Sequence, residues 1–89
     1  MVSIKQATIA AKEFARSVLE PDQVNTLRLE EVESGIVDGK PLWLITLSVS
    51  APDQVNALVV WARRDYKTFA VHKDSGEVLS MKIREMAVA

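Results

Sequence analysis

The segment Asp65–Arg84 reads DYKTFAVHKDSGEVLSMKIR, and its two halves match each other as the arms of a β-hairpin. Asp74-Ser75-Gly76 fits a three-residue loop, a type I turn followed by a glycine in the left-handed region. We therefore expect two antiparallel strands here, one that includes residues 66–72 and one that covers residues 77–84.

This loop predicts a register in which one face of the hairpin is apolar and the other is mixed. On the apolar face Val71 lies opposite Leu79, Phe69 opposite Met81, and Lys67 opposite Ile83. On the mixed face the expected pairs are His72 with Val78, Ala70 with Ser80, Thr68 with Lys82, and Tyr66 with Arg84. A slip of one residue would set the apolar side chains against polar ones, so the alternation favours this register.

A second hairpin is predicted upstream, between strands near residues 26–33 and 42–49. A three-residue loop at Val37-Asp38-Gly39 pairs Leu29 with Leu47 and Leu27 with Val49. A two-residue turn at Asp38-Gly39 would instead place Leu29 opposite Ser48, so we prefer the longer loop.

The N-terminal segment has the pattern of an amphipathic helix from about Ser3 to Glu20. Ser3 and Gln6 form a capping-box signal, and Pro21 ends the helical pattern. The apolar positions at helical spacing are Ile4, Ala7, Ala11, Phe14, Ala15 and Val18. The expected fold is α+β, with one helix packed on a three- to four-stranded antiparallel sheet in the order α-β-β-β-β. The expected core sets Phe14 and Val18 against Leu29, Ile45, Leu47, Phe69 and Met81.

Residues 50–64 allow two interpretations. Val55, Leu58, Val59 and Ala62 fit a helical stripe, whereas residues 58–61 could extend the third strand backward through a bulge near Arg63. We favour the strand. The pentapeptide Pro-Asp-Gln-Val-Asn occurs at 21–25 and again at 52–56, but the flanking patterns differ, so we interpret it as a reused linker rather than a structural repeat.

Composition indicates one small domain over residues 1–89, because a chain of 89 residues buries only roughly 60% of its unfolded surface and forms a single core. With no cysteine, disulfides, thiolate zinc sites and thiol nucleophiles are excluded. A net charge of −1 gives no general attraction to nucleic acid or membranes, and we expect neither as a partner. The first residues lack the pattern of a signal peptide, so the cytoplasm is the expected location.

The sequence shows no constellation for catalysis. His72 is the only histidine, which excludes a metal site with two histidines and leaves no second histidine to activate a serine. Glu30 and Glu31 are expected to point to opposite faces of a strand and so not to act as a carboxylate pair. We therefore expect no enzyme activity and no cofactor.

Two surfaces remain as candidate partner sites. One is a cationic and aromatic cluster, Trp61, Arg63, Arg64, Tyr66 and Lys67, for which we favour strand-edge packing over stacking on single-stranded nucleic acid. Trp61 and Trp43 could also anchor a partner or a dimer. The other is the sheet face not covered by the helix, with Thr46, Thr68, His72, Ser80, Lys82 and Arg84.

The order of a helix followed by strands, together with the closing hairpin Tyr66–Met81, resembles the PepSY domain. The shared features are an aromatic-lysine start, a Ser-Gly turn and Val-Leu after it, although His72 stands where the family often has aspartate and residues 50–64 look like an insertion. PepSY domains occur in protease propeptides and bacterial envelope proteins, and the resemblance implies binding or inhibition of peptidases. We therefore expect a non-enzymatic module that binds a protein or peptide, or alternatively a structural homodimer.

Overall fold

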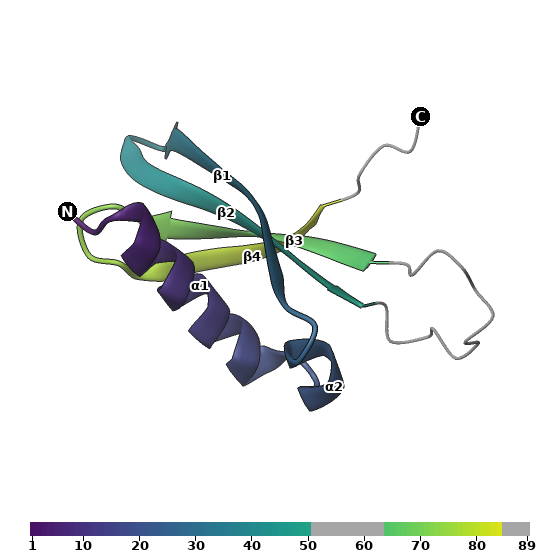
Figure 1. The fold of residues 1–89 in the computed structure, drawn as a ribbon. Coiled ribbons are helices and arrows are strands. Elements are labelled where there is room, and N and C mark those ends of the chain that lie inside the picture. Colours follow the sequence, from purple (N-terminus) through teal and green to yellow (C-terminus); the bar gives the residue numbers. More distant parts are fainter. Residues whose placement is uncertain (51–63, 85–89) are drawn as a thin grey trace.

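The computed structural model describes residues 1–50 and 64–84. These residues form helices α1 (Ile4–Val18) and α2 (Pro21–Val24) and strands β1 (Arg28–Val37), β2 (Lys40–Ser50), β3 (Arg64–His72) and β4 (Val78–Arg84) (Figure 1). Neighbouring strands are antiparallel, and their order in the sheet is β1-β2-β3-β4. The predicted fold class, a helix on an antiparallel sheet, is confirmed.

Helix α1 begins at the predicted capping box. The Ser3 side chain accepts a hydrogen bond from the backbone of Gln6, and the Gln6 side chain accepts one from the backbone of Ser3. The helix ends at Val18, two residues earlier than expected, and Pro21 begins the short helix α2 rather than only ending a helix. Proline suits this first helical position because its missing N–H has no partner there in any case.

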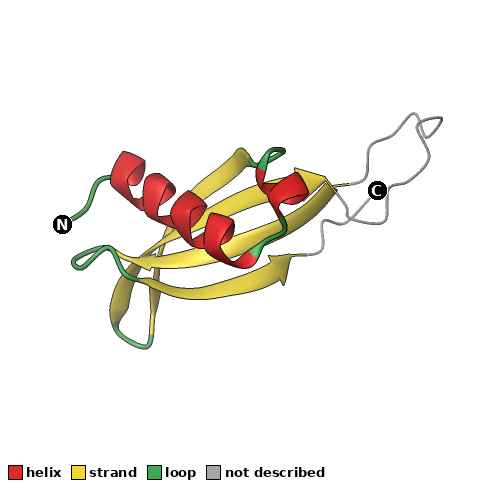
Figure 2. Cartoon of the chain, turned by 90° about the horizontal axis from the view of Figure 1, so that it is seen from below, coloured by secondary structure: helices red, strands yellow, loops and turns green. Residues whose placement is uncertain are grey.

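Helix α1 lies across one face of the sheet (Figure 2), and the core lies between them. Three alanines one helical turn apart, Ala7, Ala11 and Ala15, are fully buried. On the sheet side the core consists of Ile45, Leu47, Phe69 and Val71. Phe14 packs edge-on against Phe69, with ring centroids 6.1 Å apart. The prediction for Val18 and Leu29 is wrong, because both side chains are about half exposed near the margins of the helix–sheet layer.

The turn between β1 and β2 has two residues, not three. Asp38 and Gly39 both have positive φ angles, 51° and 77°, the geometry of a type I′ hairpin turn. Even so, Leu29 lies opposite Leu47 as predicted, because the register shifts between Leu29 and Glu31. Glu30 is the additional residue of this β-bulge. The bulge therefore compensates for the shorter turn, and the sequence pattern alone could not separate the two solutions.

The closing hairpin follows the predicted register from Tyr66–Arg84 up to Ala70–Ser80 and then shifts by one residue. Val71 lies opposite Val78 instead of Leu79, and the predicted pair of His72 with Val78 is wrong as well. His72 donates its backbone N–H to Glu77 and accepts one from Gly76, so the loop is one residue longer than predicted. Leu79 is the residue left over in this second bulge.

The start of the chain is attached to the sheet beside this loop. Val2 donates its backbone N–H to the Lys73 carbonyl at 2.6 Å, and the Val2 carbonyl accepts the indole N–H of Trp43 at 3.2 Å. The Lys73 ammonium lies 4.3 Å from the centre of the Trp43 ring and also donates to the Ser34 hydroxyl. Trp43, which we considered as a partner or dimer anchor, therefore holds the N-terminal segment.

Candidate binding groove on the outer face of the sheet

The face of the sheet opposite α1, called the outer face below, contains a groove of about 210 Å³. Alternate residues of the strands point to this side, because successive side chains in a strand project to opposite faces. The groove runs from the β1–β2 turn across β2 and β3 to β4. It is lined by Val37, Asp38, Lys40, Leu42, Leu44, Thr68, Ala70, Leu79, Ser80 and Lys82.

The floor of the groove is apolar. Leu42 and Ala70 are buried within it, and Leu44 lies between them at the position opposite Ala70. Leu79 contributes the β4 side and is 39% exposed. Leu79 reaches this face because the bulge in β4 gives its place in the core to Val78, which packs against the buried cluster. Without that bulge, Leu79 would face α1 and the groove would lose this wall.

The rim of the groove carries charge. Lys40 stands at the end near the β1–β2 turn and Lys82 stands on β4, and both side chains are exposed. The ion pair Arg28–Glu30 involves neither of these lysines. Among the described residues that line the groove, Asp38 in the turn beside Lys40 is the one acidic side chain. The described lining therefore carries a net positive charge.

A polar network occupies the other end of the outer face. The Arg64 guanidinium reaches across β2, donating to the Ser48 hydroxyl at 2.8 Å, to the Ser48 carbonyl at 3.0 Å and to the Thr26 carbonyl at 2.6 Å. The Ser48 hydroxyl donates in turn to Glu30 at 2.6 Å. These bonds occupy the Arg64 guanidinium and the Ser48 hydroxyl, so this end of the face is not an open site. The network of Thr26, Glu30, Ser48 and Arg64 is called the clamp below.

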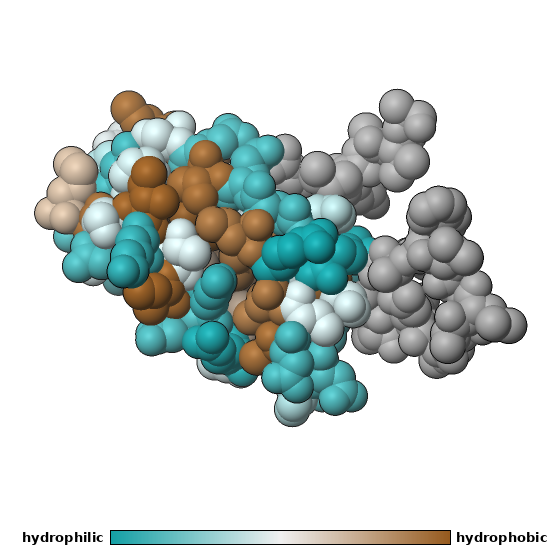
Figure 3. Space-filling model, in the orientation of Figure 1, coloured by the Kyte–Doolittle hydropathy of each residue, from teal (hydrophilic) through white to brown (hydrophobic). Residues whose placement is uncertain are grey.

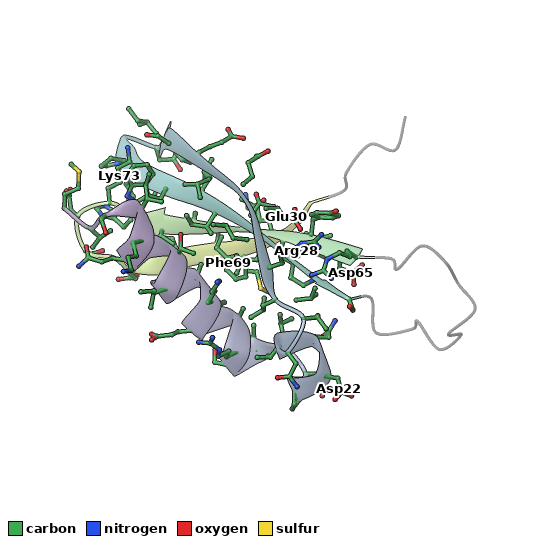
Figure 4. All side chains as sticks on the ribbon, in the orientation of Figure 1. Asp22, Arg28, Glu30, Asp65, Phe69 and Lys73 are labelled. Atoms are coloured by element: carbon green, nitrogen blue, oxygen red, sulfur yellow. The ribbon has the colours of Figure 1, made fainter. Side chains whose placement is uncertain are left out.

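Glu30 is the charged centre of that clamp. Its carboxylate also accepts a hydrogen bond from Arg28 at 2.7 Å, and its side chain is 25% exposed (Figure 4). The bond from Ser48, followed by the bond from Arg28, holds the pKa of Glu30 below its ordinary value, since both favour the charged form. The bulge at Glu30 turns its side chain to the face that Glu31 shares with Thr46, so the prediction that these two glutamates point apart is wrong.

A threonine pair separates the clamp from the groove. The hydroxyls of Thr46 and Thr68 are 3.0 Å apart on adjacent strands, and Thr68 also lines the groove. The outer face is thus divided into a hydrogen-bonded end around Ser48 and an apolar end around Leu42 and Leu44.

The structure places the predicted partner residues that it describes at different positions and does not bring them together in one site. Lys82 lines the groove, as does Ser80. Arg64 belongs to the clamp, and the Nδ1 atom of His72 accepts hydrogen bonds from the backbone N–H groups of Asp74 and Ser75, so His72 shapes the loop. Tyr66 is half-buried on β3 with Arg84 opposite it on β4, away from the groove. Trp61 and Arg63, the two interpretations of residues 50–64 and the second copy of the pentapeptide lie outside the described residues, apart from Ser50 and Arg64 at the strand ends.

Sequence reasoning missed the apolar floor of the groove. The signal was present, because residues 42–47 form an almost continuous apolar run, which is typical of a strand covered on both faces rather than on one. The predicted core includes only Ile45 and Leu47 of this run, which lie on the side facing α1. Leu42 and Leu44 supply the opposite, outer side.

Metal-ligand clusters and membrane-spanning helices were sought among the described residues. No group of three or more histidine or carboxylate side chains among residues 1–50 and 64–84 could hold a metal ion. Neither described helix is long and apolar enough to cross a membrane. Comparisons with protein-family models, with curated proteins and with solved structures found no match. The functional argument therefore rests on the groove itself.

Proposed function

We propose that this chain is a non-enzymatic module that binds a protein or peptide in the outer-face groove. The observation that carries the proposal is an apolar depression of about 210 Å³ on a sheet face with no helix above it in the described structure. Concave, largely apolar sites with a few polar groups at the rim are the usual form of ligand sites in proteins.

A peptide suits this groove better than a bulky cofactor. The volume accommodates about one large apolar side chain, whereas typical pockets for small molecules are roughly 300–1,000 Å³. The groove also ends on β4, which is an edge strand of the sheet. An extended segment that enters over this edge and lies on the outer face could place one side chain in the groove.

The resemblance of the closing hairpin to PepSY domains supports the same class of function. In that family the implied partner is a peptidase, and regulation of a peptidase is the finer form of our proposal. Family members are typically exported, whereas we propose a cytoplasmic location for this chain, because a sequence without cysteine suits a reducing compartment.

Selection from a random peptide library displayed on phage tests the proposal. A Ser80→Trp variant fills the groove, and an Ile9→Trp variant places the same side chain on the exposed surface of α1 as a matched control. We expect the enriched peptides to bind the unmodified chain and Ile9→Trp equally and to lose binding to Ser80→Trp. Enriched peptides that are insensitive to Ser80→Trp but sensitive to Ile9→Trp would contradict a role for the groove.

A homodimer through a strand edge is the second candidate, and the edge strand β1 favours it. Ile36 on this strand is 76% exposed, and Leu29 and Val37 are also exposed. Helix α1 lies over β2, β3 and β4, so it leaves β1 uncovered, and Figure 3 shows apolar surface between the helix and this strand. Exposed apolar edges favour pairing with another chain.

Sedimentation equilibrium distinguishes this candidate from a monomeric binding module. A homodimer predicts twice the monomer mass at micromolar concentration and its loss in Ile36→Asp, with Ile9→Asp on α1 as the matched control. A monomer mass at all concentrations would contradict the homodimer.

A further inference from the structure

We infer that the ligand of the groove is an extended peptide segment with an apolar side chain flanked by two acidic residues. This inference rests on the proposed function and adds the chemistry of the partner. It is carried by the positions of Lys40 and Lys82 relative to the apolar floor.

The two lysines lie at opposite ends of the groove. Lys82 on β4 lies opposite Thr68 on β3, and Thr68 lies opposite Thr46 on β2. Thr46 is six residues after Lys40 on the same strand. From strand geometry the Cα atoms of Lys40 and Lys82 are about 20 Å apart along the strands and about 10 Å apart across them. Both side chains line the groove. A ligand in the groove therefore meets a positive charge at each end.

The apolar floor lies between these charges. Leu42, Leu44, Ala70 and Leu79 leave room for about one bulky apolar side chain. In an extended peptide, residues i, i+2 and i+4 point to the same side and span about 14 Å. A segment in the pattern acid-x-apolar-x-acid would thus place its central side chain on the floor and direct a carboxylate toward each lysine.

Charge complementarity chooses between ligand types. Lysines at the two ends of the groove disfavour a basic segment and favour an acidic one, while the apolar floor disfavours a ligand that is acidic throughout. Asp38 beside Lys40 opposes the acidic ligand at one end. Removing the Asp38 carboxylate should therefore strengthen binding of the acidic ligand. Nonspecific binding of apolar peptides would not change with this substitution.

Three blocked peptides test the inference by NMR titration of the full chain. They are acetyl-Glu-Ser-Phe-Ser-Glu-amide, its counterpart with lysine in place of glutamate, and its counterpart with alanine in place of phenylalanine. We expect the first to shift the amide signals of Leu42, Ala70 and Leu79 and to bind about threefold to tenfold more tightly than the other two at low salt. The advantage over the lysine peptide should shrink in 0.5 M salt, because exposed charges are screened.

Variants of the chain then locate the charges. Lys40→Glu combined with Lys82→Glu should reverse the preference between the acidic and the basic peptide, and Lys5→Glu on the exposed surface of α1 should leave it unchanged. Asp38→Asn should tighten binding of the acidic peptide, and this substitution suits the turn because asparagine tolerates positive φ. The Asp38→Asn variant therefore tests the role of charge even if the double lysine variant does not fold.

Each contrary result has a distinct meaning. Equal binding of the acidic and basic peptides in the groove, or a preference that the lysine substitutions leave intact, would overturn the inference and leave the proposed function standing. Tight binding of the alanine peptide would overturn the role of the apolar floor. No shifts with any of the peptides would overturn the inference, while the library selection still tests the proposed function. Shifts that map only to α1, or that appear only with rising protein concentration, would overturn the inference and the proposed function together.

Discussion

Val71 of β3 lies opposite Val78 of β4, although the next pair along the same hairpin is Ala70 with Ser80. The residue between the two pairs on β4, Leu79, therefore leaves the core side and lines the groove on the outer face. This single shift links the packing of the core to the shape of the candidate site. It gives neighbouring apolar residues, Val78 and Leu79, different roles.

Alanine substitutions at these two neighbours should differ in their effect on stability. We expect Val78→Ala to lower the free energy of unfolding by about 1–2 kcal/mol, because Val78 packs against the buried cluster. Leu79→Ala removes more carbon atoms but should cost less than about 1 kcal/mol, since Leu79 is 39% exposed on the outer face. Urea unfolding monitored by circular dichroism measures both. The reverse order would show that Leu79, not Val78, packs under α1.

Phe69 is a large, fully buried side chain of the core between the sheet and α1, and its removal should be the more damaging of two phenylalanine substitutions. Phe69 is fully buried, so Phe69→Ala should destabilise the chain by about 3–5 kcal/mol. Phe14, its edge-on partner, is half-buried and Phe14→Ala should cost clearly less. Thermal unfolding provides the comparison. Near-equal losses would place Phe69 outside the centre of the core.

Alanine substitution should have opposite effects on stability at two glycines, Gly39 in the β1–β2 turn and Gly35 in strand β1. A Cβ at Gly39 would touch nothing within 4 Å, so the cost of Gly39→Ala arises from its φ of +77° alone and should be about 1 kcal/mol. Gly35→Ala in strand β1 should be neutral or stabilising, because its Cβ would make an ordinary contact with Leu44 at 3.4 Å. The midpoint of urea unfolding reports both changes. A destabilising Gly35→Ala together with a neutral Gly39→Ala would contradict the two-residue turn.

The clamp at Glu30 predicts a stability difference that depends on pH. Because the folded-state pKa of Glu30 is lowered, its stabilising effect is complete above the ordinary value of 4.5 and is lost as the pH falls through the lowered folded value. Glu30→Gln should therefore be less stable than the unmodified chain at pH 7, and the gap should narrow toward pH 2. Urea unfolding at several pH values between 2 and 7 measures this gap. A gap that stays constant would show that Glu30 contributes by shape and not by charge.

The central part of each hairpin could be predicted from alternation, but the loops could not. For the first hairpin, a three-residue loop and a two-residue turn followed by a bulge at Glu30 both place Leu29 opposite Leu47. The preference of Asp-Gly for type I′ turns was the signal for the shorter turn. For the second hairpin, Val78 and Leu79 are both apolar, so either could face the core, and only packing against α1 decides between them.

The candidate site was predicted only at its edge. Lys82 and Ser80 were assigned to the correct face, since strand alternation gives faces directly. The role of Arg64 was not accessible, because its long side chain crosses β2 to Thr26, a contact between residues far apart in the sequence. The groove itself depends on the bulge at Leu79 and on Leu42 and Leu44, none of which was predicted from the sequence.

Contacts between a bound peptide and the methyl groups of the chain test the central claim most directly. In a complex with acetyl-Glu-Ser-Phe-Ser-Glu-amide, intermolecular nuclear Overhauser effects report which methyl groups lie near the phenyl ring. We predict contacts with Leu42, Leu44 and Leu79 of the outer face. Contacts confined to Ile4, Ile9 or Val18 of α1 would contradict the assignment of the groove as the binding site.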